Sequence, residues 1–220
     1  EKADIVTGYT TYVEMLKEFF PDKTYLATPT MQEVKRCRMA VEEAMKDQTV
    51  AMVSSGDSGI YGMAGIIYQV AEEMGADIEI ETVPGVTAAS AAASVLGAPL
   101  MHDFAVISLS DLMTPLDLIM KRVDCAGQSD LIVCLYNPKS KKRTGYVEQA
   151  ADILMKYRSP ETPVGIVRHA GRKGEQSQIT TLAELKDAEI DMFSVVLIGN
   201  SQTYVSNGRM ITPRGYNLEK

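Results

Sequence analysis

The sequence predicts an α/β fold, in which a mainly parallel β-sheet is covered by helices. Short runs rich in Val and Ile alternate with helical patterns along the chain, as they do in repeated β–α–β units. The 220 residues are enough for one large domain or two small ones that bury most of their unfolded surface. The 45% of hydrophobic and 23% of charged residues are typical of globular proteins, which excludes a disordered chain.

Each strand is expected where a short apolar run lies between polar turns. These runs cover residues 4–7, 24–27, 50–54, 78–83, 104–108, 131–136, 164–168 and 194–199. Helices are expected between them, and residues 30–33 and 181–184 fit the capping-box pattern of a helix start. Thr114 followed by Pro115 fits an N-cap with proline at the first helical position. Asn207–Gly208 lies between two alternating stretches and predicts a type I′ hairpin, so the last part of the chain is less purely parallel.

The best candidate for a domain boundary is the polar break that follows the strand expected at residues 104–108. We therefore expect an N-terminal α/β domain over residues 1–109 and a C-terminal α/β domain over residues 110–220. The sequence shows neither an internal repeat nor a low-complexity tract.

Charge and cysteine content exclude several classes of protein. With 22 Lys and Arg against 29 Asp and Glu, the net charge of −7 argues against a general nucleic-acid binder and a basic membrane-surface protein. No apolar run approaches the ~20 residues of a membrane span. The isolated Cys37, Cys125 and Cys134 indicate a reducing compartment, so we expect a cytoplasmic protein. His102 and His169 lie far apart with no cysteine nearby, and no dedicated metal site is expected.

Ligands of open α/β sheets bind beyond the carboxyl ends of strands, which directs the search to the loops after the expected strands. Residues 54–62 (SSGDSGIYG) contain glycines that let a ligand approach the backbone, and Asp57 can accept hydrogen bonds from it. The alternative is a tight glycine turn in which Asp57 caps the next helix. The GDSG segment is similar to the nucleophile segment of trypsin-like serine proteases, but both histidines follow Ser58 and the scaffold is α/β, which excludes that triad.

The next loop, residues 83–93 (VPGVTAASAAA), has very small side chains. They permit a flat ligand to lie against a helix N-terminus, where Thr87 offers a hydroxyl. The alternative is a helix packed closely on the sheet.

Two later loops, residues 137–143 and 168–173, concentrate positive charge beyond strand ends in an otherwise acidic protein. Such clusters suit a ligand that carries carboxylates or phosphates, although either cluster alone also fits a solvated surface. His169 fits a general acid or base, a metal contact, or a loop residue satisfied by the backbone. The candidate substrate-binding residues are Lys139, Lys141, Arg143, Arg168 and Arg172.

Together these loops resemble the motifs of the tetrapyrrole methylase family, the S-adenosylmethionine-dependent enzymes of corrin and sirohaem synthesis. The similar segments are residues 56–62 (family pattern G-D-x-x-x-x-G), 83–88 (V-P-G-[IV]-[TS]-A), 136–138 (Y-x-P) and 167–170 (V-x-x-[AG]). Within the family, Ser58 in place of the common proline, together with SLSDLMTP, LYNP and RHAGR, resembles the precorrin-3B or cobalt-precorrin-3 C17-methyltransferase branch.

The resemblance implies two α/β domains with the active site in the cleft between them, and a homodimer. It also implies a strand and a glycine- and proline-rich loop ahead of residue 1, which this sequence does not include. By the same resemblance, the S-adenosylmethionine site is lined by Gly56, Asp57, Ile60, Thr87, Ala88, Tyr136, Asn137 and Ala170.

The implied reaction is SN2 transfer of a methyl group to ring carbon C17, with linked contraction of the macrocycle as C20 leaves the ring. An activated methyl group needs alignment more than a strong nucleophile, so the absence of a triad is expected. The basic loops would hold the carboxylate-rich tetrapyrrole, with or without cobalt. For the proton movements of contraction, or a contact to cobalt, the candidates are His169, Asp111 and Ser110.

Two alternatives stay open. One is a methylase of the same family that acts on another ring carbon, or on a protein histidine derivative as diphthine synthases do. The other is a non-catalytic α/β domain that binds an anion and turns nothing over.

Overall fold

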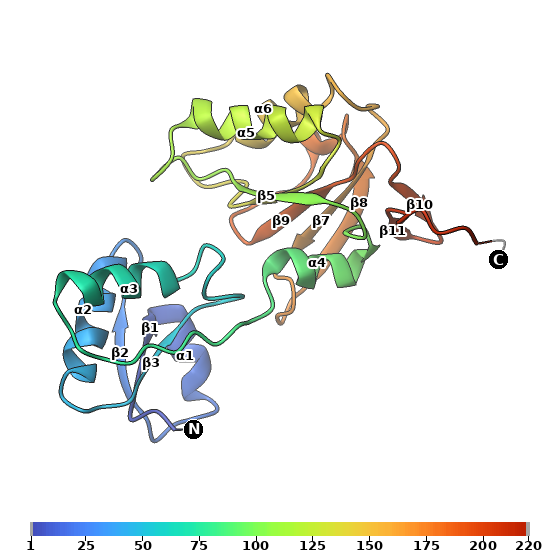
Figure 1. The fold of residues 1–220 in the computed structure, drawn as a ribbon. Coiled ribbons are helices and arrows are strands. Elements are labelled where there is room, and N and C mark those ends of the chain that lie inside the picture. The colour runs from blue at the N-terminus through green and yellow to red at the C-terminus, as the bar shows by residue number, and fades with distance from the viewer. Residues whose placement is uncertain (1, 219–220) are drawn as a thin grey trace. The chain divides into compact units, whose positions relative to one another are not determined.

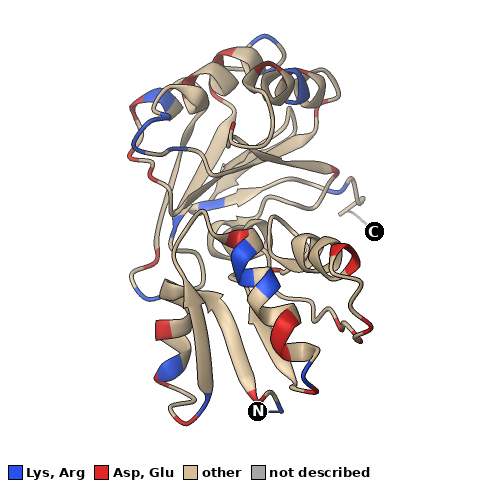
Figure 2. Ribbon diagram, turned by 90° about the vertical axis from the view of Figure 1, so that its left-hand side faces the viewer, with Lys and Arg blue, Asp and Glu red and all other residues tan. Residues whose placement is uncertain are grey.

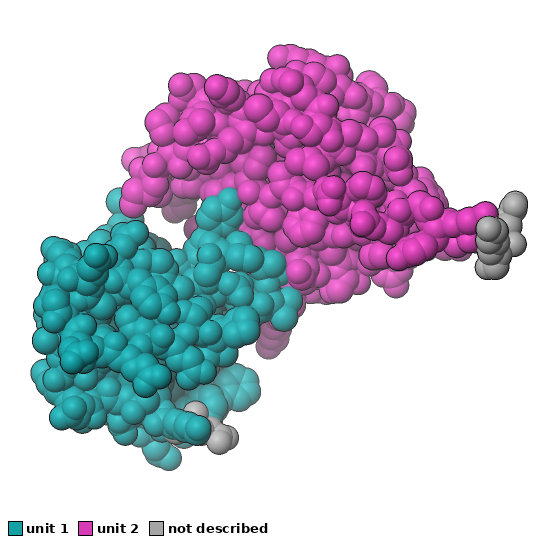
Figure 3. Space-filling view, in the orientation of Figure 1, with its two compact units in different colours: residues 1–87 teal, residues 88–220 magenta. Residues whose placement is uncertain are grey.

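A computed structural model describes residues 2–218 of the chain. Within them, the chain forms two compact units that divide between Thr87 and Ala88 (Figures 1 and 3). Both units combine helices with a β-sheet, so the predicted α/β class is confirmed. No helix in this part of the chain is both long enough and apolar enough to cross a bilayer.

The first unit contains a parallel sheet with the strand order β2-β1-β3. The central strand β1 (Ile5–Tyr9) is almost wholly buried, as a strand between two neighbours should be. Helices α2 and α3 share a small apolar core with Cys37, Val41, Val70 and Ala71. The other elements of this unit are β2 (Thr24–Thr28), β3 (Val50–Val53), α1 (Thr10–Lys17), α2 (Glu33–Ala44) and α3 (Ala64–Glu73).

The second unit contains a mixed sheet with the order β5-β6-β9-β7-β8. Strands β5 and β6 are parallel, whereas β9 runs antiparallel to both β6 and β7. The expected mainly parallel sheet is therefore found in the first unit and needs correction in the second. The edge strand β8 is also antiparallel to its neighbour β7, because the two are joined by a short loop that permits only an antiparallel pair. The strands are β5 (Phe104–Ser108), β6 (Ile132–Tyr136), β7 (Pro163–Arg168), β8 (Gln176–Thr181) and β9 (Ser194–Ile198).

Helices cover both faces of this sheet (Figure 1). On one face, α5 (Leu116–Gln128) and α6 (Tyr146–Leu154) pack on the largest apolar core of the described residues. On the other face, α4 (Ala88–Leu96) packs through Leu96 on Cys134, Val167 and Leu197. Alternate residues of one strand thus enter different cores, because successive side chains of a strand point to opposite faces.

The division at Thr87 differs from the boundary expected between residues 109 and 110. Helix α4 packs on β7 and β9, and β5 pairs with β6, so both elements belong to the second unit. The polar break after Ser108 is a strand-end loop inside that unit.

One expected strand is absent, and two strands were not expected. Residues 77–87 form no regular element, although Ile78 and Ile80 alternate with exposed glutamates and pack against the α2–α3 core. This segment has the pattern of a strand but pairs with none, and a strand needs a partner ladder. Conversely, β8 was not expected, because it is a polar edge strand (QSQITT). The two-residue β4 (Gly97–Ala98) also went unpredicted and pairs with β11.

The turn and helix-start predictions have mixed outcomes. The hairpin of β10 (Tyr204–Ser206) and β11 (Arg209–Ile211) is confirmed, with φ values of 49° at Asn207 and 70° at Gly208. The capping box at residues 30–33 is wrong, because Met31 has a φ of 62° and α2 begins only at Glu33. Helix α5 begins after Pro115 rather than at it.

The capping box at residues 181–184 forms in part. The backbone N–H of Glu184 donates to Thr181 Oγ1 over 3.4 Å, and only the short 3-10 helix η1 (Leu185–Asp187) follows.

Candidate functional site

In the first unit, Asp57 joins the loop after β3 to the segment that leads into α4. One carboxylate oxygen accepts a hydrogen bond from the N–H of Gly59, and the other accepts one from the N–H of Gly85, both over 2.8 Å. These bonds, with that from Gly85 contributing most, hold the pKa of Asp57 below its usual value because they favour the charged form. Asp57 therefore connects and stabilises the two segments. This agrees with the tight glycine turn of the alternative interpretation, but not with its helix cap.

The same two segments approach each other at backbone distance. A Cβ atom on Gly85 would overlap the carbonyl oxygen of Gly56, so only glycine fits at this position. A second bond runs from Ser58 Oγ to the carbonyl oxygen of Val83 over 3.3 Å. Asp57 does not cap α3, since it is Ser54 Oγ that accepts the N–H of Met63 at the start of that helix.

The tip of this loop presents apolar side chains. Ile60 is 41% and Tyr61 57% exposed, and Tyr61 has a φ of 54°. A non-glycine residue in the left-handed region costs free energy, and such residues cluster at ligand-binding loops.

In the second unit, the strands β5, β6 and β7 end at the same edge of the sheet. They run in one direction, because β9 lies between β6 and β7 and is antiparallel to both. We call this edge, which is defined by Ser108, Tyr136 and Arg168, the carboxyl edge. The loops that start here carry the predicted residues Ser110, Asp111, Asn137, His169 and Ala170.

Tyr136 connects the carboxyl edge to the start of α4. Its hydroxyl oxygen accepts the backbone N–H of Ala89 over 2.6 Å, in the first turn of that helix. The next residue, Asn137, has a φ of 50°, and its side-chain amide donates to Ser108 Oγ over 2.9 Å. The predicted residues Ala88, Tyr136 and Asn137 therefore lie together.

Asp111 is engaged by two neighbours. The hydroxyl of Tyr146 donates to one of its oxygens over 2.7 Å, and Arg143 Nε lies 3.6 Å from the other. The hydrogen bond to Asp111 raises the pKa of Tyr146, since a carboxylate acceptor favours the protonated phenol. Ser110 contacts the same edge through its N–H, which donates to Ser108 Oγ over 3.2 Å.

His169 is held by the backbone and by an aromatic neighbour. It has a φ of 53°, its N–H donates to the carbonyl oxygen of Phe193, and its ring stacks on that of Phe193 with 4.9 Å between the centroids. This geometry fits a loop residue satisfied by the backbone that still presents a half-buried imidazole.

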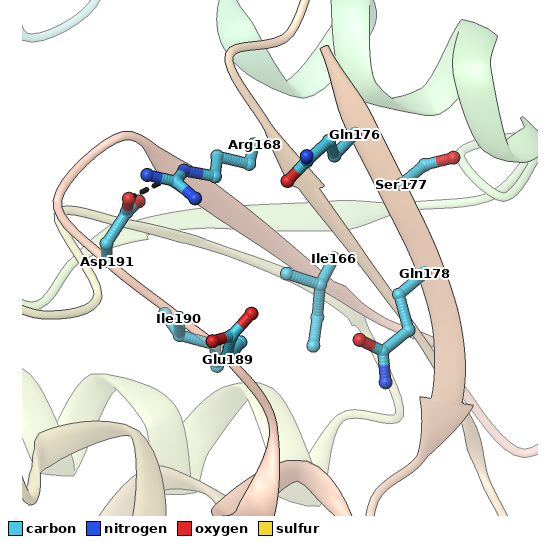
Figure 4. Close-up of a pocket in the computed structure, with 8 residues that line it drawn as sticks. All are labelled: Ile166, Arg168, Gln176, Ser177, Gln178, Glu189, Ile190 and Asp191. Carbon is cyan, nitrogen blue, oxygen red and sulfur yellow. Dashed lines mark ion pairs between the residues drawn. The ribbon is translucent and has the colours of Figure 1, made fainter. Parts of the chain in front are cut away.

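Arg168 lies in an ion pair. Its Nε is 2.7 Å from Asp191 Oδ2, on the sheet face opposite α4, beside an open groove of about 510 Å³ (Figure 4). Arg143 likewise faces Asp111, whereas Lys139 and Lys141 extend from the loop after β6. Figure 2 shows positive charges on several loops among acidic residues. The groove is lined by Ile166, Arg168, Gln176, Ser177, Gln178, Glu189, Ile190 and Asp191.

The predicted residues thus fall into two groups. Gly56, Asp57, Ile60 and Thr87 lie in the first unit, and the remaining candidates lie along or beside the carboxyl edge of the second. Among residues 2–218, no three His, Cys, Asp or Glu side chains come together in a way that could hold a metal ion.

Sequence reasoning missed Tyr146, Asp191 and Phe193. Asp191 accepts hydrogen bonds from the N–H of Phe193 and the hydroxyl of Ser194, and it pairs with Arg168, so it fixes the turn that enters β9. The available signal was an aspartate three residues before a buried strand, which is typical of an Asx turn.

A family model described as Tetrapyrrole (Corrin/Porphyrin) Methylases matches residues 1–186. The chain belongs to this family. The family expected from the four loop motifs is therefore confirmed, and the two-unit α/β fold is the fold of a tetrapyrrole methylase.

Relatives agree with this assignment. The chain is 49% identical to a probable cobalt-factor III C(17)-methyltransferase from Salmonella typhimurium, over 99% of this chain and 90% of the relative. It is 46% identical to a cobalt-factor III methyltransferase from Priestia megaterium, over 98% of this chain but only 41% of that longer protein.

Solved structures show the same fold. The crystal structure of the methyltransferase CobJ has a TM-score of 0.87 and 33% identity, and the match covers 96% of this chain and 89% of that one. A uroporphyrin-III C-methyl transferase from Thermus thermophilus, complexed with S-adenyl homocysteine, has a TM-score of 0.65 over 90% of this chain and 86% of that one. At 19% identity, this second likeness concerns the fold alone.

Proposed function

We propose that the chain is an S-adenosylmethionine-dependent C-methyltransferase of cobalamin biosynthesis. Its substrate would be a tetrapyrrole at the precorrin-3B or cobalt-precorrin-3 level, methylated at C17 with linked contraction of the macrocycle. The observation that carries this proposal is the 49% identity, over 99% of the chain, to a probable cobalt-factor III C(17)-methyltransferase. The names of the relatives favour the cobalt-bearing form of the substrate.

The backbone and the small side chains of the predicted residues suit S-adenosylmethionine. Gly56, Gly59 and Gly85 are exposed and have no side chains, so a ligand can approach the backbone closely here, while the N–H groups of Gly59 and Gly85 stay bonded to Asp57. The first turn of α4 carries only small side chains, which leaves room for a flat ring beside Tyr136. In support, a structural neighbour of the same fold was solved with S-adenyl homocysteine.

The work of the protein in this reaction is positioning. S-adenosylmethionine, when bound, supplies an activated methyl group. Asp57 holds two loops of the first unit at fixed backbone distance, and Tyr136 holds the start of α4. Holding reactants in a productive arrangement contributes about 7–11 kcal/mol to such reactions, so no nucleophilic triad is required.

The cations of the loops after β6 and β7 would attract the carboxylates of the tetrapyrrole, with the exposed Lys141 foremost and the partly exposed Lys139 and Arg172 beside it. His169, Asp111 and Ser110 are proposed for the proton movements of ring contraction. We also propose a cytoplasmic homodimer, on the basis of the family resemblance and the isolated cysteines.

The test is methyl transfer with defined substrates under anaerobic conditions. The protein is incubated with S-adenosylmethionine carrying a deuterated methyl group and with cobalt-factor III, cobalt-precorrin-3, precorrin-3B or uroporphyrinogen III in separate reactions. We expect one labelled methyl group on a cobalt-bearing substrate, with NMR placing it on C17 of a contracted ring. Methylation of uroporphyrinogen III alone, or of another ring carbon, would assign a different activity in the family.

Calorimetric titration with S-adenosylhomocysteine is the companion measurement. Binding is expected. The absence of both binding and turnover would favour a non-catalytic anion-binding domain.

A further inference from the structure

Arg143 lies in the loop between β6 and α6, and its guanidinium group is directed at the protein itself. Nη1 donates to the carbonyl oxygen of Leu109 over 2.8 Å and to that of Asn137 over 3.2 Å. Nε lies 3.6 Å from Asp111 Oδ1. The side chain is only 14% exposed. One cation therefore contacts both the loop that follows β5 and the loop that follows β6.

Several further bonds make this arrangement rigid. The N–H of Leu109 donates to the carbonyl oxygen of Tyr136 over 2.9 Å, so the two loops are already paired where they leave the sheet. The backbone of Arg143 forms a closed turn with Ser140: Ser140 N–H donates to the Arg143 carbonyl over 3.0 Å, and Arg143 N–H donates to Ser140 Oγ over 3.2 Å.

Asp111 extends the arrangement to α6. Its second oxygen accepts the hydroxyl of Tyr146, the first residue of that helix, over 2.7 Å. The next residue, Val147, is buried in the main apolar core, so the polar contacts are anchored to a packed helix.

Lys141 is a useful contrast within the same loop. It is exposed, and among residues 2–218 it makes no hydrogen bond or ion pair. A cation that recognises a carboxylate ligand must offer donors outward, as Lys141 does. A guanidinium whose donors end on two carbonyl groups and a carboxylate instead fixes backbone positions.

We infer that Arg143 is a positioning residue, not a substrate-binding one. It locks the loop after β5 to the loop after β6, so that Ser110 and Asp111 are presented at a fixed place beside Tyr136 and Asn137. The consequence for methyl transfer rests on the proposed function, whereas the locking of the two loops does not.

The first experiment therefore uses the ligand-free full chain. Hydrogen–deuterium exchange is followed in peptides that cover residues 109–115 and 137–142, for the wild type, Arg143→Met, Arg143→Lys and Lys141→Met. Lys186→Met, at an exposed lysine of η1 outside both loops, is the control for loss of a surface charge. We expect at least tenfold faster exchange in both peptides for Arg143→Met, and a partial return for Arg143→Lys, which keeps a charge but has fewer donors. The two lysine variants should match the wild type. Unchanged exchange in Arg143→Met would overturn the inference.

The second experiment separates positioning from substrate binding by kinetics. Arg143→Met should lower kcat at least tenfold with little change in the KM for the tetrapyrrole. Lys141→Met should raise that KM in a salt-dependent way, as expected for an exposed charge that attracts carboxylates. A rise in KM alone for Arg143→Met would show that the residue binds substrate. If the wild type methylates none of the four tetrapyrroles, the proposed function fails. The exchange experiment still tests whether Arg143 holds the loop after β5 to the loop after β6.

Should Arg143→Met fail to fold, Asp111→Asn and Tyr146→Phe remove the outer contacts of the same arrangement. We then expect faster exchange mainly in the 109–115 peptide. Wild-type exchange in both of these variants would count against the inference.

Discussion

At the scale of single residues, backbone N–H groups do much of the work at the candidate site. The carboxylate of Asp57 accepts hydrogen bonds from two backbone N–H groups of different segments, and the hydroxyl of Tyr136 accepts one from α4. A polar side chain that accepts a backbone hydrogen bond fixes a loop without any apolar core beneath it. Such residues look like ligand contacts in the sequence, because the same atom types serve both purposes.

The pH dependence of stability provides a test of Asp57. Its pKa is depressed in the folded protein, mainly by the N–H of Gly85, so the charged carboxylate stabilises the fold above its ordinary pKa of 3.8. This stabilisation is lost as the pH falls from 3.8 through the lower folded value. In urea unfolding, we expect Asp57→Asn to be less stable than the wild type at neutral pH, with the difference shrinking on acidification. A constant difference would show that the charge is not involved.

Gly85 provides a second test at this scale. Alanine at this position would place a Cβ against the carbonyl oxygen of Gly56, and we expect a loss of about 1–3 kcal/mol together with weaker S-adenosylhomocysteine binding. The matched control is Gly65→Ala in α3, where the added Cβ meets no atom within 4 Å. It should be neutral or stabilising by up to about 1 kcal/mol in thermal unfolding. Equal effects of both variants would contradict the close approach of the two segments.

At the scale of elements, Arg158 joins three of them. Its guanidinium donates to the carbonyl oxygens of Leu131 and Gly199, at the start of β6 and the end of β9, and over 3.4 Å to Ala126 in α5. The residue is only 6% exposed, and burial lowers its pKa. The contacts hold the sheet at the end opposite the carboxyl edge.

We expect Arg158→Met to destabilise the protein by about 3 kcal/mol, because buried carbonyl groups lose their donor. The measurement is urea unfolding of the full chain, with Arg158→Lys as a variant that restores part of the loss. A change below about 0.5 kcal/mol, typical of a surface position, would contradict this role.

The sequence predicted best those elements that the sheet buries on both faces. Strands β6, β7 and β9 are rich in Val and Ile because their side chains enter the cores on either side. The edge strand β8 was not predicted, because a strand that borders solvent on one side can consist of polar residues. Residues 78–83 were wrongly predicted to form a strand. Their alternating apolar residues indicate that one face is buried, but they do not show that the segment has a hydrogen-bonded partner strand.

The loops of the candidate site could be located from the sequence, but the contacts of their side chains could not. The strand-end rule located the loops after Tyr136 and Arg168 correctly at one edge. Whether a cation in such a loop faces a ligand or the protein depends on carboxylates that lie far from it in the sequence. Asp111 and Asp191 reach Arg143 and Arg168 only through the fold, so no local pattern reveals them.

At the scale of the whole molecule, the division at Thr87 makes a prediction about fragments. Residues 88–220 keep α4 and β5, whereas residues 110–220 lack both and would expose the apolar face formed by Cys134, Val167 and Leu197. We expect cooperative thermal unfolding of the longer fragment by circular dichroism and none of the shorter one. Cooperative unfolding of the shorter fragment would contradict this division and support a domain boundary after residue 109.

The antiparallel β9 has a consequence for the order in which the protein is made. Strands β6 and β7 do not touch each other in the sheet, because β9 lies between them and is synthesised last of the three. The loops after β6 and β7 therefore acquire their final spacing only when residues 194–198 have left the ribosome and inserted. Pairing between distant segments is slow. We therefore expect the carboxyl edge, and with it half of the candidate site, to form late in folding.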